Sequence, residues 1–238
     1  METLKGKNVL IVGATGGIGE KVAKLITSSG GIAYLTGRNV AKLAAVAQEC
    51  NISYDKCFEM NITDESSVNN CVQQILESAG SIDILVNAAG IGIIKPMDTL
   101  TTADFIATLQ TNLIGTFYLV KAVLPKMKEL KKGLIINIPG VLGKVPMAGA
   151  AAYSASKYGI VGMMQSIREE IKRTDIRITN LFLGGVDSPF WDTIDLRVQR
   201  DKMVVTEEAA KAIWFLCQQP TSGVVSEMVL QPFNHQAI

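Results

Sequence analysis

The chain has 238 residues, of which 48% are hydrophobic and 19% charged, and its formal net charge is +1. This length is ample for one well-buried core, and a single α/β domain over residues 1–238 fits it better than two domains. The near-neutral charge gives no electrostatic reason to expect nucleic acid or an anionic membrane as a partner.

The four cysteines are scattered and lack the paired spacing of a metal site, so we predict no metal centre and a reducing compartment. They are Cys50, Cys57, Cys71 and Cys217. The first apolar run is too short for a secretion signal, and the apolar stretch 148–164 is interrupted by polar residues. We therefore expect a soluble, cytoplasmic protein.

Apolar strand-like runs alternate with helical patterns along nearly the whole chain. The predicted strands are 8–12, 32–36, 57–61, 84–88, 134–138, 176–182 and 228–230. The predicted helices are 17–29, 39–49, 64–79, 102–130, 152–173 and 206–218. Thr63, Asp64 and Thr206 stand where N-caps are expected. The alternation predicts parallel strands joined by right-handed crossovers, and so a doubly wound, Rossmann-like sheet of about seven strands.

The first predicted strand runs directly into a turn that contains Gly13, Gly16, Gly17 and Gly19. Glycines allow a strand to bend at once into a helix, and they let a dinucleotide pyrophosphate approach the main chain. The first amides of the following helix and its dipole would bind the phosphates. The spacing Gly-x-x-x-Gly-x-Gly differs from the Gly-x-Gly-x-x-Gly of other dinucleotide enzymes. A glycine-rich bend that binds no ligand is the alternative.

The second predicted strand leads into Gly37 and Arg38, where a dinucleotide fold meets the adenosine ribose. An acidic residue at this place would bind the ribose hydroxyls of NAD, and Gly37 offers none. The guanidinium of Arg38 suits a phosphate, so the sequence favours NADP. A solvated surface arginine is the alternative.

Two asparagines lie among apolar residues. Asn87, at the end of the fourth predicted strand, can satisfy backbone groups there, in a cofactor site or in a purely structural role. Asn112 lies within the predicted helix 102–130, where an asparagine side chain competes for backbone hydrogen bonds. We expect a local distortion or a bound water at Asn112. A buried amide satisfied by a neighbouring helix is the alternative.

A long segment without clear strand character, 189–205, follows the sixth predicted strand and carries Phe190, Trp191 and Met203. Ligands of doubly wound sheets bind beyond the carboxyl ends of the strands, so this segment is placed to cover a substrate. The alternative is a surface excursion that contains a short helix.

Tyr153 and Lys157 are four residues apart in a predicted helix and so share one face. A nearby ammonium favours the phenolate and lowers the tyrosine pKa toward working pH, where the hydroxyl acts as a general acid or base. Reduction of a carbonyl requires a proton on oxygen as hydride reaches carbon, and such a pair can supply it. The pattern is weak alone, and it gains force from its position after the fifth strand of a dinucleotide fold.

These pieces together resemble the short-chain dehydrogenase/reductase family. The matching motifs are Gly13-Ala-Thr-Gly-Gly-Ile-Gly19, Asn87-Ala-Ala-Gly90, Asn112 and Tyr153-x-x-x-Lys157, in this order. The resemblance covers the whole chain. It implies one Rossmann-like domain that transfers hydride between NAD(P) and a small-molecule alcohol or carbonyl, usually as a homodimer or homotetramer.

The resemblance also implies residue roles. Tyr153 would be the acid/base, Lys157 would hold the nicotinamide ribose and lower the tyrosine pKa, and Asn112 would hold a water in the proton relay. Thr36-Gly37-Arg38 matches the NADP-preferring members. The implied cofactor-binding residues are Gly13, Thr15, Gly17, Ile18, Gly19, Arg38, Asn61, Ile62, Asn87, Ala88, Tyr153, Lys157, Val186 and Ser188.

The sequence departs from the family at the catalytic serine, whose place in Asn137-Ile138-Pro139-Gly140 is taken by Gly140. Further departures are Leu183-Gly184 for Pro-Gly, Ser188 for threonine, Asn61 for aspartate and Ala88 for asparagine. Cofactor binding is compatible with most of these changes, whereas catalysis is where they matter. Two functions therefore stand: an NADP-dependent oxidoreductase, whose activity Gly140 can reduce, and an NADP(H)-binding sensor or scaffold without turnover.

The predicted helices 102–130 and 152–173 are too apolar for either to face solvent entirely. Ile160, Val161, Met163, Met164 and Ile167 cover more than one narrow stripe. By the resemblance, these helices form a two-fold symmetric subunit interface. The lone histidine, His235, is expected at the surface or at an interface rather than in the catalytic site.

Overall fold

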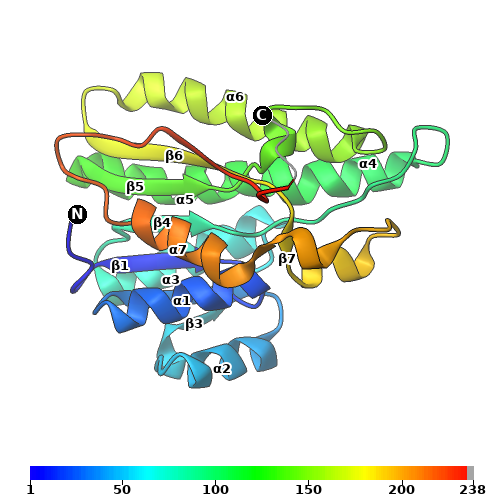
Figure 1. The fold of residues 1–238 in the computed structure, drawn as a ribbon. Helices are drawn as coiled ribbons and strands as arrows, with labels where there is room; N and C mark the ends of the chain where they lie inside the picture. Colours follow the sequence, from blue (N-terminus) through cyan, green and yellow to red (C-terminus); the bar gives the residue numbers. More distant parts are fainter. Residues whose placement is uncertain (235–238) are drawn as a thin grey trace.

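The computed structural model describes residues 1–234 and contains one twisted sheet covered by helices on both faces (Figure 1). Seven parallel strands lie in the order β3-β2-β1-β4-β5-β6-β9. Their bounds are β1 Asn8–Val12, β2 Ile32–Gly37, β3 Cys57–Glu59, β4 Ile84–Asn87, β5 Lys132–Asn137, β6 Asp175–Leu183 and β9 Glu227–Leu230. The predicted α/β Rossmann-like fold, with about seven parallel strands, is confirmed.

Both faces of the sheet are buried, which explains why its strands read as continuous apolar runs. One face packs against α1 (Gly17–Ser28), α2 (Val40–Glu49) and α7 (Thr206–Leu216). The other face packs against α3 (Glu65–Ala79), α5 (Gly115–Leu130) and α6 (Ala151–Ile171), with α4 (Thr102–Leu109) beside α6. Within β1, Val9 and Ile11 face the first layer, and Leu10 and Val12 face the second.

The predicted helix 102–130 is interrupted in the structure. A π-helical turn over Gln110–Ile114 separates α4 from α5 and contains the buried Asn112. Such turns accommodate an extra residue in a helix and often lie at functional sites. The local distortion expected at Asn112 is therefore present.

Of the three predicted N-caps, Asp64 is confirmed, and Thr63 and Thr206 were wrong. Asp64 caps α3 by accepting a hydrogen bond from the Ser66 amide, whereas Thr63 lies outside the cap. Val205 is the N-cap of α7, and Thr206 is its first residue. The hydroxyl of Thr206 bonds Glu207 instead of a helix amide, so the expected cap at Thr206 was wrong.

The segment after β6 contains strand structure that the sequence did not reveal. Val186–Asp187 (β7) pairs in parallel with Val204–Val205 (β8). Short 3₁₀ turns lie between them at Pro189–Thr193 and Arg200–Lys202. Two-residue strands are too short to show an alternating pattern, which is why they escaped prediction. The β7–β8 pair therefore joins the two ends of this segment.

Apolar side chains remain exposed on the helices that were expected to form an interface. Phe105, Ile106, Phe117 and Tyr158 are each more than a third exposed, at 37%, 58%, 45% and 44%. The homo-oligomer stays a prediction, and His235 lies outside the described residues.

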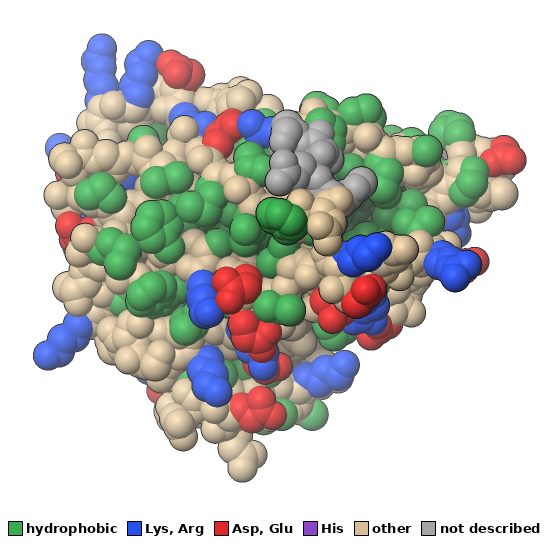
Figure 2. Space-filling model, viewed as in Figure 1, with side chains coloured by type: hydrophobic (Ala, Val, Ile, Leu, Met, Phe, Trp, Pro, Cys, Tyr) green, Lys and Arg blue, Asp and Glu red, His purple; other side chains and the backbone are tan. Residues whose placement is uncertain are grey.

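Figure 2 shows charged side chains of both signs interspersed over α7 and the segment beyond β7. No helix in the described part of the chain is long and apolar enough to cross a membrane.

Candidate active site

The turn between β1 and α1 brings its glycines against neighbouring backbone. Gly13 has a φ of +80°, which side-chain-bearing residues rarely adopt, and a Cβ there would lie 2.9 Å from the Ala89 nitrogen. A Cβ on Gly19 would lie 2.3 Å from the Gly13 carbonyl oxygen. The turn therefore leaves its main chain uncovered by side chains, and we call this uncovered main chain the cradle. A side chain at Gly13 or Gly19 would occupy it.

The first turn of α1 presents free amides to this cradle. Gly16 caps the helix without a side-chain hydrogen bond, and the first bonded amide is that of Glu20, which donates to the Gly16 carbonyl over 3.1 Å. The amides of Gly17, Ile18 and Gly19 have no acceptor among the described residues. Free amides at the positive end of a helix dipole suit a pyrophosphate, so these residues fit a dinucleotide.

Arg38 lies just beyond β2, at the edge of a hollow that it shares with Asn61 and Asp64. Its exposed guanidinium makes no ion pair or hydrogen bond within the described part of the chain. Beside it, a Cβ on Gly37 would lie 3.4 Å from Thr15 Cγ2, so Thr15 packs against the end of β2. The side-chain oxygen of Asn61 is used locally, accepting from the Thr63 amide at 3.2 Å and its hydroxyl at 2.9 Å. A free guanidinium at this end of the cradle fits a 2′-phosphate.

The remaining predicted cofactor residues surround the same edge of the sheet. Ala88 donates its amide to the Val12 carbonyl over 2.9 Å and packs against Gly13. Ser188 is buried, and its Cβ lies 3.5 Å from the place of a Cβ on Gly17, while Val186 is buried in β7. Ile62 is buried against the start of α5, 2.8 Å from the place of a Cβ on Gly115.

Three buried asparagines lie in register near the carboxyl ends of neighbouring strands. Asn87 in β4 pairs with Asn137 in β5, and Asn137 pairs with Asn180 in β6. Asn87 donates to Thr116 Oγ1 over 2.9 Å, whereas the amides of Asn137 and Asn180 have no partner among the described residues. Folded proteins satisfy such groups with ordered water. Sequence reasoning found only Asn87, although an asparagine recurring in three apolar strands was the available signal.

Asn112 joins the loop after β4 to α6. Its Oδ1 accepts the Ile91 amide at 2.9 Å, and its Nδ2 donates to the Ile91 carbonyl at 2.9 Å and to Ser156 Oγ at 3.0 Å. The distortion and the satisfied amide, which the sequence presented as alternatives, both occur. The water that Asn112 would hold in a proton relay stays a prediction.

Tyr153 and Lys157 lie one turn apart on α6. The Lys157 ammonium donates to the Ile138 carbonyl oxygen, just past the end of β5, over 3.1 Å. It also lies 5.3 Å from the centroid of the Tyr153 ring. Burial lowers the pKa of Lys157 to about 8. The ammonium therefore connects the predicted acid/base to the end of the sheet.

The pKa of Tyr153 shifts in the direction opposite to the one expected from its lysine. Burial raises it above its ordinary value. The cause is the loss of hydration on burial, and the nearby ammonium, which donates to the Ile138 carbonyl, does not reverse this shift. Tyr153 is consequently a neutral phenol at pH 7, which is the form that donates a proton.

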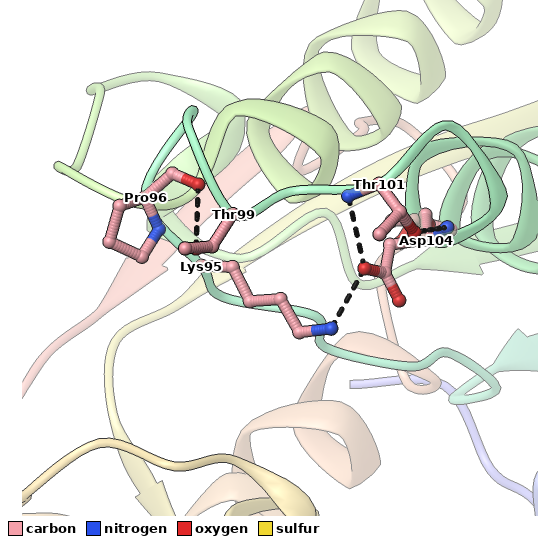
Figure 3. Close-up of polar contacts among 6 residues, drawn as sticks. Lys95, Pro96, Thr99, Thr101 and Asp104 are labelled. Atoms are coloured by element: carbon pink, nitrogen blue, oxygen red, sulfur yellow. Dashed lines mark hydrogen bonds and ion pairs between the residues drawn. The ribbon is translucent and has the colours of Figure 1, made fainter.

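The loop after β4 is held against the chain that leads into α6. The Lys95 amide donates to the Gly149 carbonyl over 2.8 Å, so this loop rests on the chain just before α6. Figure 3 shows the Lys95 side chain reaching Asp104, with Nζ 2.8 Å from Oδ2. Asp104 also accepts the Thr101 amide at 3.2 Å, in a capping box that begins α4. The loop is therefore fixed at both ends.

Residues 7–198 match the sequence pattern of the family described as short chain dehydrogenase. The chain belongs to the short-chain dehydrogenase/reductase family. An uncharacterized oxidoreductase of Staphylococcus saprophyticus is 31% identical over 98% of this chain and 100% of its own. A sepiapterin reductase of Chlorobaculum tepidum is 30% identical over 94% of this chain and 95% of its own. A metagenomic short-chain oxidoreductase, solved in complex with NADP, superposes with a TM-score of 0.83 at 29% identity and covers 97% of this chain and 99% of its own.

This short-chain dehydrogenase/reductase has an unusual backbone where the serine was expected. Gly140 has φ 68° and ψ 170°, a combination that is essentially restricted to glycine. A Cβ there would lie 3.3 Å from the Leu183 carbonyl oxygen. The Gly143 amide then donates to the Gly140 carbonyl over 3.0 Å and opens a 3₁₀ turn. A serine could not follow this path without strain, so the departure concerns the backbone as well as a missing hydroxyl.

Proposed function

We propose that the protein is an NADP(H)-dependent oxidoreductase that transfers hydride between the nicotinamide and a small carbonyl or alcohol. The observation that carries this proposal is the Tyr153–Lys157 pair, anchored by the 3.1 Å bond from Lys157 Nζ to the Ile138 carbonyl at the carboxyl edge of the sheet. Doubly wound sheets bind their ligands at this edge. Cytoplasmic localisation belongs to the same proposal, because four scattered cysteines without paired spacing suit a reducing compartment.

The choice of NADP rests on the main-chain cradle, the free amides at the start of α1 and the unpaired guanidinium of Arg38. The NADP complex of the metagenomic relative supports it. Bound NADPH would supply the hydride. Gly13, Gly17, Ile18 and Gly19 would hold the pyrophosphate, and Arg38 would hold the 2′-phosphate.

Within this reaction, Tyr153 donates its phenolic proton to the carbonyl oxygen as the substrate carbon accepts hydride. The raised pKa of Tyr153 keeps this proton in place at pH 7. The Lys157 ammonium, 5.3 Å from the ring centroid, stabilises the phenolate that forms. Asn112 fixes the loop after β4 against α6 through its bonds to Ile91 and Ser156.

A second candidate function is an NADP(H)-binding sensor or scaffold with little turnover. The conformation of Gly140 favours it, because no hydroxyl is offered to the substrate oxygen at this position. Loss of one such donor costs about 10²–10³ in rate, which is much less than a complete enhancement. With Tyr153 and Lys157 in place, the oxidoreductase remains our first proposal.

The deciding experiment measures NADPH binding by calorimetry and NADPH consumption over a panel of aldehydes and ketones. The oxidoreductase predicts binding and consumption of NADPH with at least one carbonyl. Binding without consumption would establish the second candidate, and absence of binding would overturn both. Sepiapterin, suggested by the name of the Chlorobaculum relative, belongs in the panel as one test compound.

A further inference from the structure

The segment that follows β7 is held in one conformation by a single arginine. Arg200 Nε lies 2.6 Å from Asp187 Oδ1, and its Nη1 lies 2.7 Å from Asp192 Oδ1. Its Nη2 donates to the Ser188 carbonyl over 3.0 Å. With the β7–β8 pair at the base, these bonds fix both ends of the 3₁₀ turn Pro189–Thr193. The segment 187–200, called the wall below, is therefore tied together by bonds among its own residues.

Phe190 projects from this wall toward the predicted acid/base. Its ring centroid lies 5.9 Å from that of Tyr153, with an interplanar angle of 56°. The ring also meets Trp191 edge-on, at 5.4 Å and 89°. Trp191 is itself fixed, because its Nε1 donates to the Val186 carbonyl over 2.9 Å. Phe190 is thus held in place by two aromatic contacts.

The tip of the Phe190 ring rests on Gly92, in the loop after β4. A Cβ on Gly92 would lie 2.2 Å from Phe190 Cζ and 3.0 Å from Ile194 Cδ1. Distances below 3.0 Å do not occur between real atoms of this kind, so only glycine permits this contact. Gly92 and Phe190 are therefore a matched pair that joins the loop after β4 to the wall.

We propose that Phe190 is a specificity-determining residue that selects carbonyl substrates with a flat apolar group, an inference that rests on the proposed function. A carbonyl oxygen that receives the Tyr153 proton places its substituent beside Phe190, because the two rings are in contact. Aromatic groups gain from offset or edge contacts with such a ring. Tyr153 and Trp191, whose rings contact Phe190, and Ile194, which approaches Gly92 with it, are uncharged, so a charged substituent would lose hydration without a partner. Arg200 acts through Phe190 as a positioning residue.

The test compares two uncharged ketones, acetophenone and 2-butanone. Their dissociation constants are measured by calorimetry, with and without saturating NADP⁺, so that binding is read without turnover. The same ketones are then assayed for NADPH consumption. We expect the parent protein to bind acetophenone about tenfold more tightly than 2-butanone, and Phe190→Ala to reduce this preference to about twofold. NADP⁺ affinity should be unchanged in the variant.

Gly92→Ala should also reduce the preference for acetophenone over 2-butanone, because its added methyl group would displace the Phe190 ring. The double variant Gly92→Ala/Phe190→Ala should lose no more preference than either single variant, since both act on one contact. Gly223→Ala is the matched control, because a Cβ there meets no atom closer than 3.9 Å. Arg200→Gln should weaken acetophenone binding more than NADP⁺ binding, and Arg200→Lys should restore part of the loss.

The outcomes separate the two proposals. Equal preference for acetophenone in the parent and in Phe190→Ala, or additive losses in the double variant, would overturn the assignment of Phe190. Loss of preference with retained NADP⁺ affinity supports the assignment, even if the parent consumes no NADPH with either ketone. In that last case the oxidoreductase proposal is rejected, while the proposal that Phe190 selects aryl groups is retained. Melting temperatures of all variants identify any that fail to fold, and Phe190→Leu then replaces Phe190→Ala.

Discussion

The glycine turn after β1 and the segments after β5 and β6 lie at the same edge of one sheet, but different interactions fix their shapes. The turn is fixed by backbone packed on backbone: a Cβ on Gly13 would meet the Ala89 nitrogen, and one on Gly19 would meet the Gly13 carbonyl oxygen. The segment after β6 is fixed by side chains: Arg200 bonds Asp187, and Phe190 rests on Gly92. A region fixed by backbone packing tolerates few changes and is simple to recognise from its glycines. A region fixed by side chains can change its substrate by one substitution.

The cofactor-binding side and the catalytic side of the site also differ in whether their polar groups are free or already bonded within the protein. On the cofactor side, Arg38 and the amides at the start of α1 are free to bind a ligand. On the catalytic side, most groups already serve the protein: Lys157 bonds Ile138, and both polar atoms of the Asn112 amide are engaged. Substitutions on the two sides should therefore differ in whether they affect affinity, rate or folding.

The largest effect should come from Tyr153→Phe, which removes the proposed proton donor and keeps the ring that packs against Phe190. We expect turnover to fall by about 10²–10⁴-fold while NADPH affinity stays within about twofold. Steady-state kinetics and calorimetry on the same preparation measure both. Activity above a tenth of the parent value would place the proton donor elsewhere.

Gly19→Ala tests the backbone packing of the glycine turn after β1. Its methyl group would lie 2.3 Å from the Gly13 carbonyl oxygen, so the turn must shift or the helix must move. We expect a loss of about 3 kcal/mol in unfolding free energy, together with weaker NADPH binding. Chemical denaturation measures the first effect. Gly223→Ala, whose Cβ would meet no atom closer than Pro220 Cγ at 3.9 Å, is the control and should change neither quantity.

The two sides also differ in how far the sequence could predict them. The turn after β1 was predictable because its four glycines lie close together in the sequence, and a Cβ on Gly16 or Gly19 would meet the carbonyl oxygen of Gly13 in the same turn. The positive φ of Gly140 and the contact of Phe190 with Gly92 were not, because they depend on residues far apart in the chain. The raised pKa of Tyr153 was missed for a related reason: the i, i+4 spacing indicates that Lys157 is near but not that its ammonium faces Ile138.

Gly140→Ser tests the backbone of the catalytic side. At φ 68° and ψ 170° a serine is strained, so we expect a loss of about 2 kcal/mol in stability. For a chain of this size the melting temperature should fall by about 4–8 °C. Gly140→Ala carries the same strain without the hydroxyl and is the matched control. Higher activity in Gly140→Ser than in Gly140→Ala would show that the hydroxyl still reaches the substrate oxygen.

Lys157→Met should reveal the cost of burying an ammonium. The pKa of Lys157 falls from 10.5 to about 8 on folding, so between these values the unfolded chain binds more protons than the folded one. Stability of the parent should therefore rise, relative to Lys157→Met, as the pH increases through 8. We expect the difference in unfolding free energy to change by about 2 kcal/mol between pH 7 and 9.5. A difference that is flat with pH would show that Lys157 keeps its ordinary pKa.

The smallest effect should be that of Arg38→Ala, and it tests whether the cofactor side discriminates by one charge. Because Gly37 offers no carboxylate to a ribose and the Arg38 guanidinium is unpaired within the described residues, we expect NADPH to bind at least tenfold more tightly than NADH, a difference of about 1.4 kcal/mol. Arg38→Ala should remove most of this difference by weakening NADPH alone, since NADH lacks the 2′-phosphate. The preference should also shrink as salt rises, because the guanidinium is exposed. Equal dissociation constants for the two cofactors in the unmodified protein would leave Arg38 a surface arginine. A preference that survives Arg38→Ala would instead assign the discrimination to another residue of the hollow that Arg38 shares with Asn61.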